Sequence, residues 1–222
     1  MITLHHVPES RSMRVLWLLH ELDVPFRLVE RPLDKSLRDP EFLSLSPAGR
    51  VPALEIEGER MFESGAMVEY LCERFPERGL GRLPGDMDRM AWLVWVHFAE
   101  TISQHAAALT MQHVTLYEDA MRSPVVMRLE AARLAKCYAA IEARLSTPVE
   151  NRDYLLTAGF SAADICVGQA VYMARHFARL DDFPQVKDWY ARITGREAFR
   201  RALPQEGGGR LYERDFYPAW DG

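Results

Sequence analysis

The sequence predicts an α/β domain followed by an all-helical domain. Three observations indicate this fold class. Strand and helix patterns alternate over residues 1–76, residues 77–86 are rich in proline, glycine and charge, and only helical patterns follow from there to residue 222. We therefore expect a first domain over 1–76, a linker over 77–86 and an all-helical domain over 87–222.

The first domain begins with short elements. Residues 1–5 and 26–30 have strand patterns, and residues 12–22 have the apolar spacing of a helix. The buried face of that helix would carry Val15, Leu18, Leu19 and Leu22. We expect one more short helix over residues 40–45, inside a polar connection that follows the second strand.

The segment over residues 46–64, which reads SPAGRVPALEIEGERMFES, predicts a hairpin that leads into a helix. Leu54 and Ile56 alternate with acidic residues, which indicates a half-buried strand. Proline has no N–H for the strand ladder, so Pro52 would stand at the start or edge of this strand. The bond before a proline is also where a cis peptide costs least, within about 1 kcal/mol of trans.

A turn at residues 57–59 joins this strand to a second one over residues 60–62, and a helical pattern begins at Ser64. Backbone N–H groups and a hydroxyl at a helix N-terminus suit a carboxylate, whereas the neighbouring Glu63 suits an ammonium group. An amino acid carries both charges. The segment therefore predicts a binding site for a small peptide.

The second domain shows only helical patterns. They cover residues 86–117, residues 124–145, a stretch that starts at Ser161, and a last helix that ends before Gly195. The third of these is apolar nearly all round, so it should form the buried centre of the domain. Ser161 and Asp164 have the spacing of a capping box, and we assign them a structural role.

Composition and charge narrow the classes of function. The 222 residues are 48% hydrophobic and 27% charged, which allows a sizeable core. The 27 basic and 32 acidic residues give a net charge of −5, so we expect no general attraction to nucleic acid or to an anionic membrane. The chain has no long uncharged apolar run and does not begin like a signal peptide, so we expect a cytoplasmic location.

Cysteine and histidine positions predict neither a disulfide framework nor a metal site. The cysteines lack C-x-x-C spacing, and we expect them to be buried and reduced. They are Cys72, Cys137 and Cys166. Three histidines recur every eight residues on one predicted helix and therefore do not share a face. They are His97, His105 and His113. His5 and His6 alternate along a strand and would point to opposite faces.

The segment over residues 46–64 resembles the glutathione-binding half of the cytosolic glutathione transferases, whose pattern is a Pro-x-Gly-x-Val-Pro-x-Leu run followed by Glu-Ser. Here the run spans residues 47–54 and the pair is Glu63–Ser64. The run S-R-S-x-R-V-L-W-L-L, which begins at Ser10, is similar to that of a serine-type subgroup from bacteria and fungi. The resemblance covers nearly the whole chain, and it implies a thioredoxin-like first domain and an all-helical second domain.

The resemblance also implies which residues bind glutathione. Val51, before the cis-proline Pro52, would pair its backbone with the cysteinyl unit, and Glu63 with Ser64 would hold the γ-glutamyl end. The glycine carboxylate needs a cation from the neighbouring region. The candidates are Lys35, Arg38 and Arg50.

The activating chemistry is expected between the first strand and the first helix, at Ser10, Arg11 and Ser12. Glutathione reacts as a thiolate, so its thiol pKa of about 8.5 has to fall by about two units, or about 2.7 kcal/mol. A hydrogen bond from Ser10 or Ser12 is worth about 1.5–3 kcal/mol, and a helix N-terminus adds about 0.3–2 kcal/mol. Arg11 could assist as a cation, and either serine could instead cap the helix. This segment has no cysteine, so we do not expect a mixed-disulfide mechanism, and it has no tyrosine either.

Taken together, the resemblance implies a glutathione transferase that attaches the thiol to a hydrophobic electrophile, in a homodimer that uses no metal. The electrophile would bind against apolar residues of the long helix and the C-terminal tail. These are Phe98, Met111, Tyr117, Tyr212, Phe216 and Trp220. Two alternatives stay open. One is a non-catalytic binding or interaction module, which the acidic Glu9 beside the thiol site favours, and the other is a glutathione-dependent isomerase or peroxidase.

Overall fold

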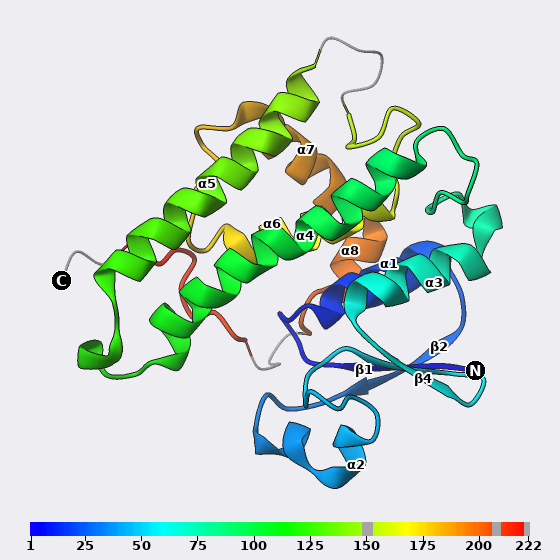
Figure 1. Cartoon of the computed structure of the whole chain (residues 1–222), viewed down its shortest axis with the longest axis horizontal. Helices are drawn as coiled ribbons and strands as arrows, with labels where there is room; N and C mark the ends of the chain where they lie inside the picture. Colours follow the sequence, from blue (N-terminus) through cyan, green and yellow to red (C-terminus); the bar gives the residue numbers. More distant parts are fainter. Residues whose placement is uncertain (148–152, 206–209, 220–222) are drawn as a thin grey trace. The chain divides into compact units, whose positions relative to one another are not determined.

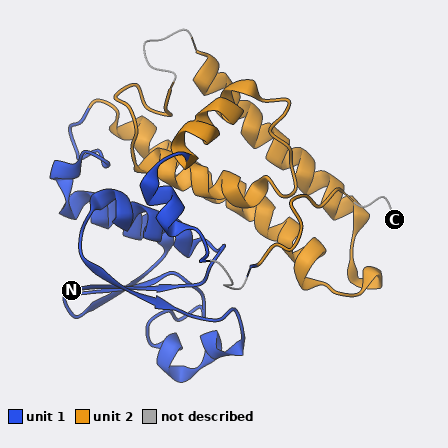
Figure 2. Ribbon diagram, turned by 180° about the vertical axis from the view of Figure 1, so that it is seen from behind, with its two compact units in different colours: residues 1–86, 195–210 blue, residues 87–194, 211–222 orange. Residues whose placement is uncertain are grey.

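The computed structural model describes residues 1–147, 153–205 and 210–219. They form two compact units, one from residues 1–86 and 195–210 and the other from residues 87–194 and 211–222 (Figure 2). The chain thus returns to the first unit after residue 194. The compact units are therefore not the two continuous ranges that the sequence analysis assigns to the domains.

The first unit contains a four-stranded sheet with the strand order β2-β1-β3-β4. The strands are β1 (Ile2–His6), β2 (Phe26–Glu30), β3 (Ala53–Ile56) and β4 (Glu59–Phe62). The central strand β1 runs parallel to β2 and antiparallel to β3, with Leu4 opposite both Leu28 and Leu54. A turn at Glu57 and Gly58, both with positive φ, joins β3 to β4 as the sequence predicts.

Helices cover both faces of this sheet (Figure 1). On one side lie α1 (Ser12–Leu22) and α3 (Ser64–Arg74), and on the other lie the 3-10 turn η1 (Lys35–Arg38) and α2 (Pro40–Leu43). Helix α1 is buried, as its apolar spacing predicts: every residue from Ser12 to Leu19 is buried. The result is the thioredoxin-like arrangement that the resemblance implied.

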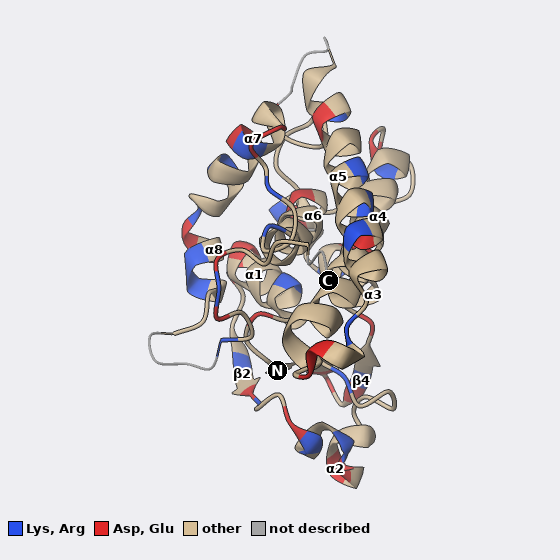
Figure 3. Ribbon diagram, turned by 90° about the vertical axis from the view of Figure 1, so that its left-hand side faces the viewer, with Lys and Arg blue, Asp and Glu red and all other residues tan. Residues whose placement is uncertain are grey.

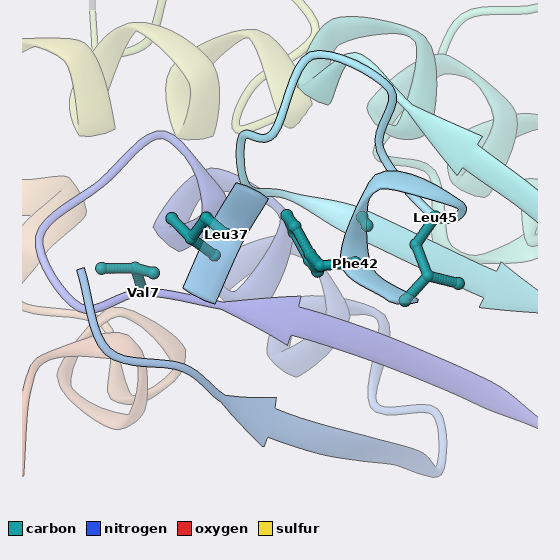
Figure 4. Packing of buried hydrophobic residues seen from close by; sticks show 5 residues of the cluster. Val7, Leu37, Phe42 and Leu45 are labelled. Atoms are coloured by element: carbon teal, nitrogen blue, oxygen red, sulfur yellow. The ribbon is translucent and has the colours of Figure 1, made fainter. Parts of the chain in front are cut away.

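A small apolar cluster holds η1 and α2 against the sheet. It consists of Val7, Leu37, Phe42, Leu45 and Ala53, and Val51 packs against it. Figure 4 shows Leu37 and Phe42 as neighbouring side chains near Val7, the residue that follows β1. The cluster therefore joins the end of β1, the η1–α2 segment and the start of β3.

Among the described residues, the regular elements of the second unit are helices, as predicted, and one isolated β-bridge joins Leu156 to Gly159. Its elements are α4 (Arg89–Thr110), the π turn η3 (Met111–Thr115), the 3-10 turn η4 (Asp119–Met121), α5 (Pro124–Ser146), α6 (Ala162–Ala174) and α7 (Pro184–Thr194). The prediction of one helix over residues 86–117 is wrong at its end. The backbone widens after Thr110, where the N–H of Leu116 bonds to the carbonyl of Met111, five residues back, at 3.0 Å. Within the described residues, no helix combines the length and the apolarity that crossing a bilayer requires.

Helix α6 forms the buried centre of the second unit, as its all-round apolar pattern predicts, and all thirteen of its residues are buried. Its first turn carries the expected capping box. The N–H groups of Ser161 and Leu155 and the indole Nε1–H of Trp189 each donate to the Asp164 carboxylate at 2.9 Å. Burial raises the pKa of Asp164 to about 6, while these donors favour its ionised form. Asp164 therefore joins α6, the preceding loop and α7.

The helix predicted before Gly195 is α7, which ends at Thr194, but it is not the last one, because a further helix follows. Helix α8 (Glu197–Ala202) belongs to the first unit, where the ring of Phe199 packs edge-on against Trp17 of α1 at 4.9 Å. The Arg196 guanidinium also forms a bidentate ion pair with Glu21, at 2.6 and 2.7 Å. A helix of six residues is too short to show apolar periodicity, which explains why the sequence analysis missed it.

We expect Asp164→Ala to lower the free energy of unfolding by about 2–4 kcal/mol, because three buried N–H donors would lose their acceptor. Urea denaturation followed by circular dichroism measures this. The matched control is Asp188→Ala, which removes an exposed carboxylate from α7 and should cost less than about 0.5 kcal/mol. Equal effects of the two substitutions would contradict the role assigned to Asp164.

Candidate functional site

The Val51–Pro52 peptide bond is cis, as the resemblance implied, and it directly precedes β3. The next residue, Ala53, lies opposite His5 of β1. Val51 itself is half-buried and packs on the apolar cluster that contains Val7. The structure thus brings Val51 together with the segment between β1 and α1.

Glu63 and Ser64 lie at the start of α3, where the predicted γ-glutamyl site requires them. Glu63 is exposed and has φ +75°, a backbone conformation that costs a non-glycine residue on the order of 1–3 kcal/mol. Ser64 is the first residue of α3 and is buried, with 5% of its surface exposed. Arg14 of α1 donates from Nη1 to Ser64 Oγ at 3.1 Å.

Arg14 contacts the candidate site, and the sequence analysis did not identify it. Its side chain is fully buried, although it carries a permanent charge. The available signal was its position, since it lies between Met13 and Val15 in a helix whose other neighbouring residues are buried. A buried guanidinium beside Ser64 adds positive charge to the helix start, which favours a carboxylate there.

The two candidate serines form one hydrogen-bonded network. Ser12 is fully buried, and its Oγ has two side-chain neighbours, Ser10 Oγ at 2.7 Å and His6 Nδ1 at 2.7 Å. Its backbone neighbours are the nitrogen of Val7 at 3.1 Å and the oxygen of Val7 at 3.2 Å. Ser10 is only half-buried. Its hydroxyl donates to the Val7 carbonyl at 2.8 Å and accepts the Ser12 N–H at 3.2 Å. Ser10 thus lies on the more accessible side of this network.

His6 is the second residue that the sequence analysis did not assign to the site. It lies at the end of β1 and is 3% exposed. Burial lowers its pKa to about 4, so the imidazole is neutral at pH 7. His5, next to it, points to the opposite face as predicted, where its Nε2 lies 2.9 Å from Glu55 and its Nδ1 accepts from Arg31 at 3.0 Å.

Arg11 and Glu9 flank the serine network along the chain. Arg11 is half-buried and directly precedes α1, and its carbonyl accepts the N–H of Arg14 at 3.2 Å. Glu9 is buried, with φ +54° in the left-handed region. The chain therefore makes a tight, unusual turn immediately before Ser10.

The candidate cations for a glycine carboxylate lie on two adjoining segments. Lys35 and Arg38 begin and end η1, and Arg50 follows Gly49; all three are exposed. A Cβ on Gly49 would lie 2.9 Å from the Leu37 carbonyl oxygen, so these two segments touch. Among the described residues, none of the three cations has an ion-pair partner. They are therefore available to an external carboxylate.

The apolar residues expected to bind an electrophile differ in exposure. Tyr212 is buried under the His176 ring, with centroids 4.3 Å apart, whereas Tyr117 is 78% exposed. Trp220 lies outside the described residues. The second unit has a hollow of about 240 Å³ whose described lining contains none of the other five. Its lining is His113, Val114, Arg122, Leu211, Glu213, Arg214 and Tyr217.

A second hollow, of about 360 Å³, lies in the first unit and contains none of the predicted glutathione ligands. It is lined by Thr3, His5, Arg27, Val29, Arg31, Glu41, Ser44, Leu45, Glu55 and Arg60. Figure 3 shows residues of both charge signs along β2 and around α2, which contribute to this lining. Within the described residues, no group of three histidine, cysteine or acidic side chains could hold a metal ion. The three cysteines are buried and form no disulfide.

Two family models match this chain. "Glutathione S-transferase, N-terminal domain" matches residues 4–79 and "Glutathione S-transferase, C-terminal domain" matches residues 112–197. Glutathione S-transferase 3 of Zea mays is 30% identical over 218 residues, which cover 91% of this chain and 93% of the relative. The disulfide-bond oxidoreductase YfcG of Escherichia coli is 28% identical, with 91% of this chain and 94% of the relative covered.

Solved structures are similar to this chain over 90% of its length. The glutathione transferase URE2P8 of Phanerochaete chrysosporium with oxidized glutathione superposes with a TM-score of 0.80 at 25% identity, over 90% of this chain and 92% of that one. A glutathione transferase homolog from Lodderomyces elongisporus with two GSH per subunit gives a TM-score of 0.82 at 17% identity, over 90% of this chain and 96% of that one. At 17% identity the likeness concerns the fold alone.

We expect Gly49→Ala to destabilise the protein by about 1–3 kcal/mol, because a Cβ would press on the Leu37 carbonyl while φ stays at +62°. The matched control is Gly58→Ala, at φ +89° with no atom within 4 Å of the added Cβ. The control carries the backbone strain without the collision, so its loss in the free energy of unfolding should be smaller. A larger loss for Gly58→Ala would show that the Gly49–Leu37 approach is not tight.

Proposed function

Because the chain belongs to the glutathione S-transferase family, we propose that its first unit binds glutathione and ionises the thiol for attack on a hydrophobic electrophile. The observation that carries this proposal is the Ser10–Ser12 network, which bonds to Val7, on whose cluster Val51 packs. A hydroxyl donor and a strand-end backbone are thus close together. These are the two features that a thiolate on a peptide ligand requires.

The proposed binding mode assigns one segment to each part of glutathione. The backbone of Val51, before Pro52, would pair with the cysteinyl unit. Ser64 and the N–H groups at the start of α3 would bind the γ-glutamyl carboxylate, supported by the Arg14 guanidinium behind Ser64. The exposed carboxylate of Glu63 would accept the γ-glutamyl ammonium group.

The glycine carboxylate would bind to one or both of Arg38 and Arg50. Their segments touch through Leu37 and Gly49, and both guanidinium groups are exposed. An arginine can bind a carboxylate through two parallel hydrogen bonds. Because such a contact is open to water, it should contribute less to affinity than the buried end of the site at Ser64.

Ser10 is the proposed hydrogen-bond donor to the thiolate, and Ser12 is not, because Ser12 is fully buried. A hydroxyl donor to an anion contributes about 1.5–3 kcal/mol, and the N-terminus of α1 adds about 0.3–2 kcal/mol. Together they match the roughly 2.7 kcal/mol needed to lower the thiol pKa by about two units. Arg11, next to Ser10, would add a nearby positive charge. The thiol proton would leave to water.

The thiolate would then attack an electrophilic carbon. In a displacement, the C–S bond forms while a leaving group departs with its electron pair, and in an addition the electrons move along a conjugated double bond. An apolar electrophile suits a site that excludes water from the sulfur. The homodimer and the cytoplasmic location stay predictions.

A second candidate is the reduction of disulfides by bound glutathione, which the similarity to the Escherichia coli oxidoreductase favours. Here the thiolate would attack one sulfur of a disulfide, and the S–S bond would break with departure of the other sulfur as a thiol. A second glutathione would attack the mixed disulfide, releasing the second thiol and forming oxidised glutathione. The reacting thiol would come from glutathione, because Cys72, Cys137 and Cys166 are all buried. Turnover of a small disulfide in the absence of measurable conjugation would favour this candidate.

We expect Ser10→Ala to lower kcat/KM for conjugation of chlorodinitrobenzene by roughly 10- to 100-fold, because the transition state loses a charged hydrogen bond. The Kd for glutathione, measured by calorimetry, should change much less. Ser64→Ala should have the opposite profile, with weaker glutathione binding and little effect on the bound thiol. Ser44→Ala, an exposed serine of the first unit, is the control and should change neither quantity. An unchanged kcat/KM in Ser10→Ala would exclude Ser10 as the activator.

A further inference from the structure

The neutral His6 imidazole is joined to the proposed thiolate donor by short contacts. His6 Nδ1 lies 2.7 Å from Ser12 Oγ, and Ser12 Oγ lies 2.7 Å from Ser10 Oγ. His6 and Ser12 are almost completely buried, so water does not compete for these contacts. The three side chains therefore form one chain that leads from the end of β1 to Ser10.

The hydrogens in this chain can be counted. Ser12 Oγ accepts the Val7 N–H at 3.1 Å, which leaves one lone pair and one hydrogen. Two oxygen atoms 2.7 Å apart need a hydrogen between them, so either Ser12 donates to Ser10 or Ser10 donates to Ser12. The tautomer of His6 decides which, because its Nδ1 either donates to Ser12 or accepts from it.

If Nδ1 accepts, the Ser12 hydroxyl donates its hydrogen to His6, and Ser10 must donate its own hydrogen to Ser12 Oγ. Ser10 would then present only a lone pair to a sulfur anion, which is repulsive. If Nδ1 donates, both lone pairs of Ser12 are filled, and its one hydrogen goes to Ser10 Oγ at 2.7 Å in preference to the Val7 carbonyl oxygen at 3.2 Å. Ser10 then accepts the Ser12 hydroxyl at 2.7 Å and the Ser12 N–H at 3.2 Å, so it keeps its own hydrogen to donate.

Only one tautomer makes Ser10 a donor toward the sulfur. In that tautomer Ser12 Oγ accepts the Nδ1 hydrogen of His6 at 2.7 Å, and Nε2 keeps its lone pair.

We propose that His6 is a positioning residue whose Nδ1–H, through Ser12, makes Ser10 a donor toward the glutathione thiolate. This inference rests on the proposed function and adds to it a residue that does not touch the ligand. Before glutathione binds, the Ser10 hydrogen points to the Val7 carbonyl at 2.8 Å. A thiolate is charged and so is the stronger acceptor, and the hydrogen turns to it. No covalent bond changes in this step.

The tautomer of His6 can be measured without any substitution. In protein labelled with ¹⁵N at histidine, we expect the His6 Nδ1 signal to be that of a protonated ring nitrogen and the Nε2 signal that of an unprotonated one at pH 7. His6→Asn identifies the signals by their loss. An unprotonated Nδ1 overturns the proposal, whatever the protein's activity.

Two substitutions of His6 test the consequence for glutathione. His6→Leu removes the donor, and we expect the thiol pKa of bound glutathione to rise by about one unit, with a fall of about 10-fold in kcat/KM for conjugation at pH 6.5. His6→Asn keeps an N–H near the position of Nδ1, and we expect it to restore both values to within about 3-fold of the wild type. A residue with a merely structural role would not show this rescue by a donor.

His5→Asn is the matched control, because His5 is the next residue along β1, is equally buried and bonds to Glu55 on the opposite face. We expect it to leave the thiol pKa of bound glutathione unchanged. If Ser10→Ala raises that pKa and His6→Leu does not, the positioning role is wrong and the proposed function stands. If the wild type does not lower the thiol pKa at all, the proposed function fails. The tautomer measurement then still shows whether His6 Nδ1 donates to Ser12.

Discussion

The junction between β1 and α1 depends on one buried hydroxyl. Ser12 Oγ accepts the Val7 N–H at 3.1 Å, so the first residue of α1 is bonded to the residue that follows β1. This bond helps to determine where the N-terminus of α1 lies relative to the strand. Ser10 lies beside Val7 as well, because its hydroxyl donates to the Val7 carbonyl, and the Val7 side chain belongs to the cluster on which Val51 packs. In the proposed binding mode, thiol activation and cysteinyl binding would therefore depend on the same packed junction.

A second buried contact couples the starts of two helices. Arg14, in the first turn of α1, donates to Ser64 at the first position of α3. The two helix starts meet at one side of the sheet, each with its positive end, and glutathione would carry a negative group to each: the thiolate to α1 and the γ-glutamyl carboxylate to α3. Removing a buried guanidinium leaves its partners unsatisfied, so Arg14 joins ligand binding to folding stability.

Local patterns predicted the elements, and long-range contacts were not predicted. The helix over residues 12–22 and the capping box at Ser161 depend on neighbours within one or two turns, and both were predicted correctly. The bond from Arg14 to Ser64 joins residues 50 positions apart, and the burial of His6 depends on the elements packed around β1. The residues of the 46–64 segment were found because their spacing is itself local. The proposal of Ser10 as the thiol donor required the observation that Ser12 has no exposed surface.

The most direct test of this account is a pH titration of glutathione's thiolate absorbance in the presence of saturating protein. The account predicts an apparent thiol pKa about one to two units below the free value of about 8.5, because the Ser10 hydroxyl and the α1 N-terminus stabilise the anion. An unchanged pKa for glutathione that is bound, as calorimetry on the same sample would establish, would contradict the account and favour a binding module without thiol activation.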